Sequence, residues 1–76
     1  MQKNRLEELT NLILAMARRE IYNGVGRVFK EELQALGYRD EEISEAIAEI
    51  SSRLKVETVG NIIKVYFTKR RKIFRV

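Results

Sequence analysis

The apolar residues of this chain change their spacing about two thirds of the way along it. Up to residue 54 they recur at steps of three and four, which is the period of amphipathic helices. From Val56 onward the chain is rich in β-branched and aromatic residues, which strands favour. A chain of 76 residues has room for one small core. The sequence therefore predicts a single α+β domain over residues 1–76, in which three helices precede a β-hairpin.

The first helix is expected over residues 4–22. Its apolar stripe consists of Leu6, Leu9, Ile13, Met16 and Ala17, widened by Leu12 and Ile21. We expect the helix to end at Asn23-Gly24, because glycine readily adopts the left-handed conformation that closes a helix. The widened stripe either covers the strands or forms an interface with a second copy of the chain, and the sequence leaves both open.

Two further helices are expected on either side of a short turn. A brief extended stretch at residues 27–29 leads into a helix over about residues 29–36, which Gly37 ends. Asp40 is a good N-cap for the next helix, which runs to about Leu54. The buried stripe of this third helix would consist of Ile43, Ala46, Ile47, Ile50 and Leu54. Tyr38, directly after the glycine, is expected to pack against the core.

The last third of the chain allows two different hairpins. One turns at Gly60-Asn61, between residues 55–59 and 62–67, and has the better turn chemistry. The other turns at residues 68–71, between strands 63–67 and 72–76, and places four cations at its tip. We favour the second hairpin because it pairs the two most strongly patterned apolar strands. Gly60 would then end an extension of the third helix or a connecting turn.

The composition argues against most catalytic chemistry. The chain has no cysteine and no histidine, which excludes disulfides, Cys/His zinc sites and His-dependent nucleophilic catalysis. We therefore expect a binding protein rather than an enzyme, with no metal, no cofactor and no evident small-molecule ligand. No segment approaches the roughly 20 apolar residues of a membrane span, so no membrane partner and a cytoplasmic location are expected.

The modest net charge of +4 conceals two regions of opposite charge. Residues 38–60 carry three basic and six acidic residues, whereas residues 61–76 carry six basic and no acidic ones. A dense run of cations is what binding to a phosphate backbone needs. The distribution predicts a nucleic-acid partner that meets the C-terminal end of the chain.

The order of elements resembles the winged helix-turn-helix domain. The segment FKEELQALG at residues 29–37, the turn YRD at 38–40 and the stripe that follows are similar to that family's helix-turn-helix. The segment GNIIKVYFTKRRKIFRV at residues 60–76 is similar to its strand, basic wing and strand. The small size, the excess of arginine over lysine and the absence of thiols also resemble transcription regulators of archaeal plasmids and viruses from hot environments.

The resemblance implies a regulator, with repression as the expected activity, that binds specific sequences of double-stranded DNA in the nucleoid, as a homodimer that could form on the DNA. Its third helix would enter the major groove and its wing would contact the backbone or minor groove. The wing candidates are Lys69, Arg70, Arg71, Lys72 and Lys64. The candidates in the third helix and the turn before it are Arg39, Ser44, Ser51, Ser52 and Lys55. Arg27 and Lys30 are candidates for clamping phosphates.

The third helix is unusually acidic for a recognition helix. Its outward face would carry Glu41, Glu45, Ala48, Glu49, Ser52 and Lys55. Glu45 could accept a hydrogen bond from a cytosine amino group, but we favour the simpler reading, in which the glutamates solvate the helix and Glu49 pairs with Arg53. The acidic face leaves two alternatives open: a winged-helix module that binds a protein, or a non-specific nucleic-acid binder that could also bind RNA.

Overall fold

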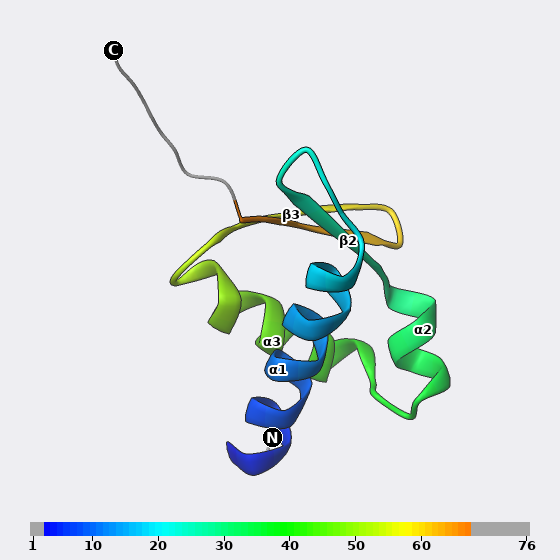
Figure 1. Ribbon diagram of the computed structural model, residues 1–76. Coiled ribbons are helices and arrows are strands. Elements are labelled where there is room, and N and C mark those ends of the chain that lie inside the picture. Colours follow the sequence, from blue (N-terminus) through cyan, green and yellow to red (C-terminus); the bar gives the residue numbers. More distant parts are fainter. Residues whose placement is uncertain (1–2, 68–76) are drawn as a thin grey trace.

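The computed structural model describes residues 3–67. Within them lie three helices and four strands: α1 (Lys3–Arg19), β1 (Ile21–Tyr22), β2 (Val25–Phe29), α2 (Lys30–Ala35), α3 (Asp40–Ser51), β3 (Lys55–Val59) and β4 (Ile62–Tyr66). The strands form one antiparallel sheet in the order β1-β2-β4-β3. The α+β class is thus confirmed, with a larger sheet than a lone hairpin (Figure 1).

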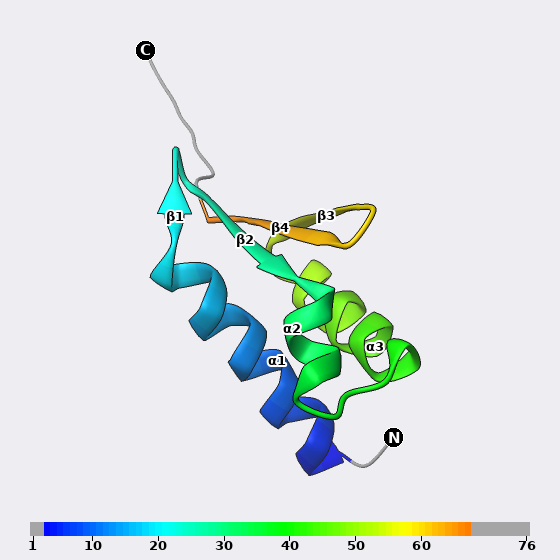
Figure 2. The same ribbon diagram turned by 90° about the vertical axis from the view of Figure 1, so that its right-hand side faces the viewer.

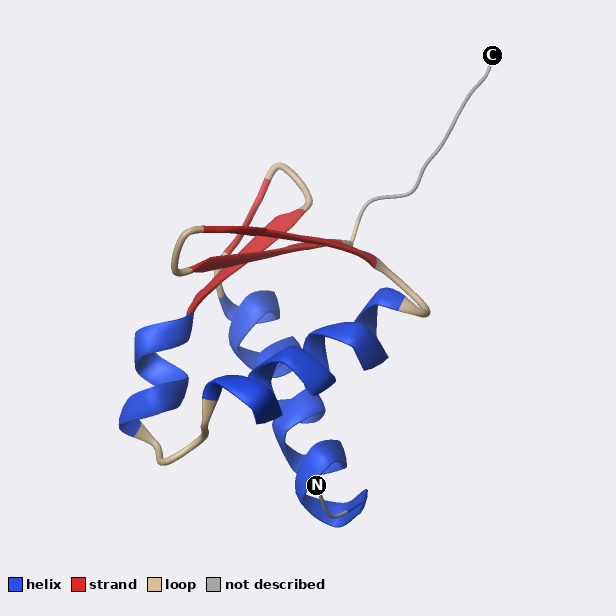
Figure 3. Cartoon of the chain, turned by 180° about the vertical axis from the view of Figure 1, so that it is seen from behind, coloured by secondary structure: helices blue, strands red, loops and turns tan. Residues whose placement is uncertain are grey.

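The helices lie on one face of the sheet. In Figures 2 and 3 the sheet forms one layer, with α1 and α3 crossing each other against it. The core between the layers comprises Leu9, Ile13, Leu14, Ala17, Val28, Leu33, Ile43, Ala46, Ile50, Ile63 and Val65. The two layers approach each other closely at Gly26, where a Cβ atom would lie 2.3 Å from the backbone oxygen of Ala17. The absence of a side chain at Gly26 therefore allows β2 to lie directly on α1.

The prediction for the end of the first helix is wrong. α1 ends at Arg19, and Asn23-Gly24 is instead the turn of a hairpin between β1 and β2. Both residues have positive φ, 55° and 78°, as a type I′ turn requires. Asn-Gly is a stronger signal for such a turn than for a helix end, so the chain reverses here and Ile21 belongs to a strand rather than to the stripe of α1.

The favoured C-terminal hairpin is also wrong. β4 pairs with β3 through a turn at Gly60-Asn61, where Gly60 has φ 59°. Its other edge pairs with β2, so that β4 has no free edge for residues 72–76. The extended stretch predicted at residues 27–29 is part of β2 and provides this second partner. Gly60 therefore shapes a hairpin turn and does not end a helix.

The turn between α2 and α3 follows the prediction with a shift at its end. Gly37 closes α2 with φ 100°, and the amides of Gly37 and Tyr38 donate to the carbonyls of Gln34 and Leu33 at 3.0 and 3.2 Å. This is the Schellman pattern. The N-cap of α3 is Arg39 rather than Asp40, which is already the first helical residue, and α3 ends at Ser51 instead of near residue 54. The helix ends early because β3 begins at Lys55 to pair with β4.

Candidate nucleic-acid interface

A cluster of side chains fixes α3 against α1. Arg5 donates from Nε to Glu42 Oε2 at 2.5 Å and from Nη2 to Glu42 Oε1 at 3.2 Å. Glu42 also accepts the backbone N–H of Arg39 at 2.9 Å. The Arg5 hydrogen bond first, and then the Arg39 amide, lower the pKa of Glu42 to about 2. Glu42 is buried, alone among the acidic residues of α3, and no local pattern in the sequence predicts this.

Tyr38 extends this cluster along α1 from Arg5 to Glu8. Its ring lies 4.6 Å from the guanidinium carbon of Arg5, and its hydroxyl donates to Glu8 Oε1 at 2.9 Å. Burial and this hydrogen bond raise the pKa of Tyr38. The side chain is half-buried against the core, which confirms the prediction that it packs inward. Four side chains thus fix α1, the turn and α3 relative to one another.

The outward face of α3 has the predicted composition except at its end, where Lys55 belongs to β3 and not to the helix. Glu41, Glu45 and Glu49 are exposed on it, and so are the candidate contact residues Ser44, Ser51 and Ser52. Ser52 already donates from Oγ to the backbone oxygen of Glu49 at 2.8 Å. The expected Glu49–Arg53 pair is not formed: in residues 4–67, the carboxylate–cation contacts within 4.0 Å are Arg5–Glu42 and Lys55–Glu57. The exposed carboxylates of α3 are therefore not neutralised by close ion pairs with any cation of the described segment.

The candidate cations divide between two surfaces. Arg39 is exposed at the start of α3, and Lys30 is half-buried at the start of α2, where its amide donates to the carbonyl of Asn61 at 2.8 Å. The other three described candidates lie on the sheet, away from the helices: Arg27 on β2, Lys64 on β4 and Lys55 on β3. Lys64 is directly opposite Arg27 on one side and Glu57 on the other. The sequence could not show this grouping because it depends on the pairing of β2 with β4.

The strongest basic run, Lys69, Arg70, Arg71 and Lys72, lies outside the described residues. Phe67 is the last described residue before this run, and its amide donates to the carbonyl of Gly24 at 2.8 Å, in the β1–β2 turn. Residues 1–67 contain ten basic and eleven acidic residues, whereas residues 68–76 contain five basic and no acidic ones. All of the net positive charge of the chain is thus supplied beyond Phe67.

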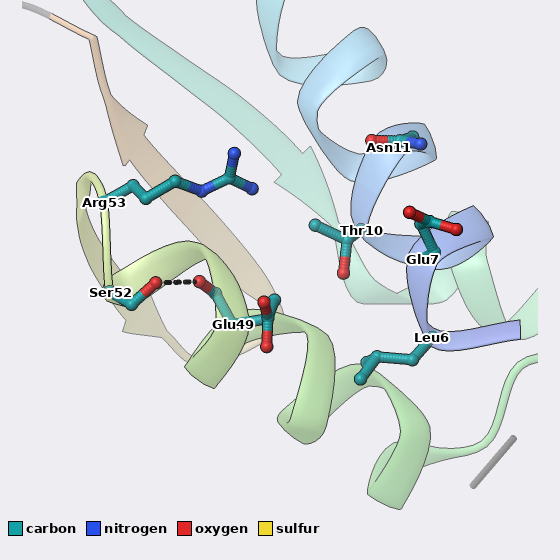
Figure 4. Close-up of a pocket in the computed structure, with 7 residues that line it drawn as sticks. All are labelled: Leu6, Glu7, Thr10, Asn11, Glu49, Ser52 and Arg53. Atoms are coloured by element: carbon teal, nitrogen blue, oxygen red, sulfur yellow. Dashed lines mark hydrogen bonds between the residues drawn. The ribbon is translucent and has the colours of Figure 1, made fainter. Parts of the chain in front are cut away.

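A shallow pocket of about 530 Å³ lies between α1 and the end of α3 (Figure 4). It is lined by Leu6, Glu7, Thr10, Asn11, Glu49, Ser52 and Arg53. The hydroxyl of Thr10 is buried beside it and has no hydrogen-bond partner among the described residues. This pocket could not be predicted from the sequence, because its lining residues meet only where the two helices cross.

No protein-family model, curated protein or solved structure matches the chain. Across residues 3–67, none of the helices has the length and apolar character needed to cross a bilayer. The same part of the chain contains no cluster of three or more potential metal-ligating residues of the His, Cys, Asp and Glu types. The function must therefore be inferred from the fold, the charges and the contacts of the chain itself.

Proposed function

We propose that the protein is a winged-helix transcription regulator that binds specific sequences of double-stranded DNA, acting as a repressor. The observation that carries this proposal is the arrangement of α2, a tight turn and α3 directly before the β3–β4 hairpin. The turn of that hairpin is tied to the start of α2 by the hydrogen bond from the Lys30 amide to Asn61. A helix-turn-helix with an adjoining hairpin is compatible with the winged-helix layout that the sequence resembles.

The charge distribution supports a particular division of labour. Five cations in residues 68–76 would supply the phosphate contacts, which position a protein on DNA without reading its sequence. Base contacts would come from the C-terminal end of α3, where Ser51 and the C-cap residue Ser52 are small, polar and exposed. The glutamates on the same helix would keep α3 from entering the major groove deeply, because they face a phosphate-lined surface.

Selection from a random pool of duplex DNA tests this function directly. The full chain is incubated with the pool, and the bound duplexes are recovered and sequenced over several rounds. A defined motif supports a specific regulator. Enrichment without a motif would instead indicate an architectural binder, and no recovery of DNA at micromolar protein would refute duplex binding.

A second candidate function follows from the exposed face of α3. Glu41, Glu45 and Glu49 are spaced by four residues, so they lie on one side of the helix and form an acidic stripe. Such a stripe is complementary to a basic protein surface and unfavourable toward DNA. A winged-helix module for protein binding is therefore the alternative if the selection recovers no duplex.

A further inference from the structure

No described residue covers the face of the sheet that points away from the helices. Side chains alternate along each strand, and the buried members of β2 and β4 are Gly26, Val28, Ile63 and Val65. Their neighbours therefore lie on the opposite, outer face. In Figures 2 and 3, α1 and α3 are both on the inner side of the sheet. Within residues 3–67, the outer face is thus an open surface formed by all four strands.

The strand register arranges this outer face in three rows. The first row contains Tyr22, Val25, Tyr66 and Lys55, the second Arg27, Lys64 and Glu57, and the third Phe29, Ile62 and Val59. Apart from Lys55, the two outer rows consist of aromatic and apolar residues, whereas the row between them is wholly charged.

The central row contains two cations side by side. Arg27 and Lys64 are directly opposite on adjacent strands, which places their Cβ atoms about 5 Å apart. Like charges in this position destabilise a sheet. Glu57 is opposite Lys64 on the other side, but its carboxylate is engaged elsewhere. It accepts a hydrogen bond from the hydroxyl of Tyr66 at 2.7 Å and lies 4.0 Å from Lys55 Nζ. An anion bound over Arg27 and Lys64 would relieve their repulsion.

Two aromatic rings are open to solvent near this pair of cations. Tyr22 is 68 % exposed and Phe29 is 44 % exposed, one in each outer row. Tyr66 is less available, because Lys55 Nζ lies 5.1 Å from its ring centroid. Exposed rings beside cations suit unpaired bases, which stack on aromatic side chains while their phosphates contact the charges. Bases within a duplex present no free ring face for such stacking.

We propose that the outer face of the sheet binds single-stranded DNA, with phosphates over Arg27 and Lys64 and bases on Tyr22 and Phe29. This surface is separate from the α3 face of the proposed function, so the inference does not rest on duplex recognition. The face carries three cations and one carboxylate, and the nine residues that follow Phe67 in the sequence contain five further cations. This charge complements a polyanion and opposes the stacking of two copies of the face.

Fluorescence anisotropy with a labelled oligothymidylate of about 12 nucleotides tests the proposal at an ionic strength of about 0.15 M. The full chain is compared with Arg27→Ala/Lys64→Ala. The matched control is Arg19→Ala/Arg53→Ala, which removes the same charge from exposed positions outside the face. A second pair compares Tyr22→Ala and Tyr22→Phe, with Leu36→Ala as a control for loss of an exposed apolar side chain, 62 % exposed and off the sheet.

The face variants should bind the oligonucleotide about tenfold more weakly, Tyr22→Phe should retain binding, and both controls should stay within about twofold. Equal losses in the two double variants would overturn the proposal, because binding would then depend on charge alone. Tighter binding of an oligouridylate, or equal binding of a duplex with the same dependence on Tyr22, would also overturn it. The duplex selection described above can fail while this result stands, and the converse is equally possible.

Discussion

Arg5 and Glu42, which are 37 residues apart in the sequence, form a bidentate ion pair that joins the first turn of α1 to the first turn of α3. Arg5 also donates to the carbonyl of Gly37 at 3.3 Å, so it contacts the turn before α3 as well. The pair thereby sets the position of the helix that carries the candidate base contacts. Because one partner is a carboxylate, this arrangement depends on pH.

The stability of the protein should fall at acid pH partly through Glu42. Its pKa is about 2 in the folded state, against an ordinary value of 4.5. A carboxyl group whose pKa is lowered on folding contributes stability above its unfolded pKa, and this contribution is lost as the pH falls from about 4.5 toward 2. Urea unfolding midpoints at a series of pH values should therefore decrease more steeply for the natural chain than for Glu42→Gln.

The matched control for this experiment is Glu45→Gln, which removes an exposed carboxylate from the same helix. Its midpoint should keep the pH dependence of the natural chain. If Glu42→Gln and Glu45→Gln show the same dependence between pH 4.5 and pH 2, the ion pair does not contribute to acid sensitivity.

Gly26→Ala should destabilise the fold, because the new methyl group would lie 2.3 Å from the carbonyl oxygen of Ala17. Backbone atoms cannot move aside as the end of a side chain can, so β2 and α1 must separate. We expect a loss of about 1–3 kcal/mol in the free energy of unfolding, measured by urea denaturation. Ala15→Ser, at an exposed position of α1, should change it by less than about 0.5 kcal/mol. Equal stabilities for the two variants would contradict the close packing.

The helices could be predicted from the sequence because their signals are local. The buried stripe of α3 and the glycine that ends α2 are each visible within a few residues. The wrong end predicted for the first helix has a local cause as well. Asn-Gly occurs both at helix ends and in type I′ turns, and the nearby β-branched Ile21 favours a strand.

The choice of partner for β4 could not be predicted in this way. It depends on β2, which pairs Arg27 with Lys64, a residue 37 positions later in the chain. The same pairing creates the cationic row of the outer sheet face, and the crossing of α1 with α3 creates the burial of Glu42. The sequence therefore predicted which residues are charged, whereas their grouping required the non-local contacts of the fold.

Arg70→Ala/Arg71→Ala should weaken duplex binding for all sequences alike. Each lost phosphate contact reduces the number of counterions that are released on binding. The magnitude of the slope of log affinity against log salt should therefore decrease by about 2. Titrations of a labelled duplex at several salt concentrations measure both effects. Arg19→Ala/Arg53→Ala serves as the charge-matched control and should leave the slope nearly unchanged. If both double variants lower the slope equally, residues 70 and 71 have no special role in contacting phosphate.

Glu45→Gln/Glu49→Gln should strengthen duplex binding if α3 faces DNA. Both carboxylates are exposed and neither forms an ion pair within 4.0 Å in residues 4–67, so their charge acts on an approaching phosphate backbone without local compensation. Removing two like charges should raise the affinity several-fold at low salt and less at high salt, because screening weakens the repulsion. The control is Glu7→Gln/Glu20→Gln, which makes the same change of charge at exposed residues of α1 and the segment after it. If the two double variants bind equally, only net charge matters and α3 does not face DNA. If Glu45→Gln/Glu49→Gln instead weakens binding, the glutamates themselves contact bases, as acceptors from cytosine amino groups would.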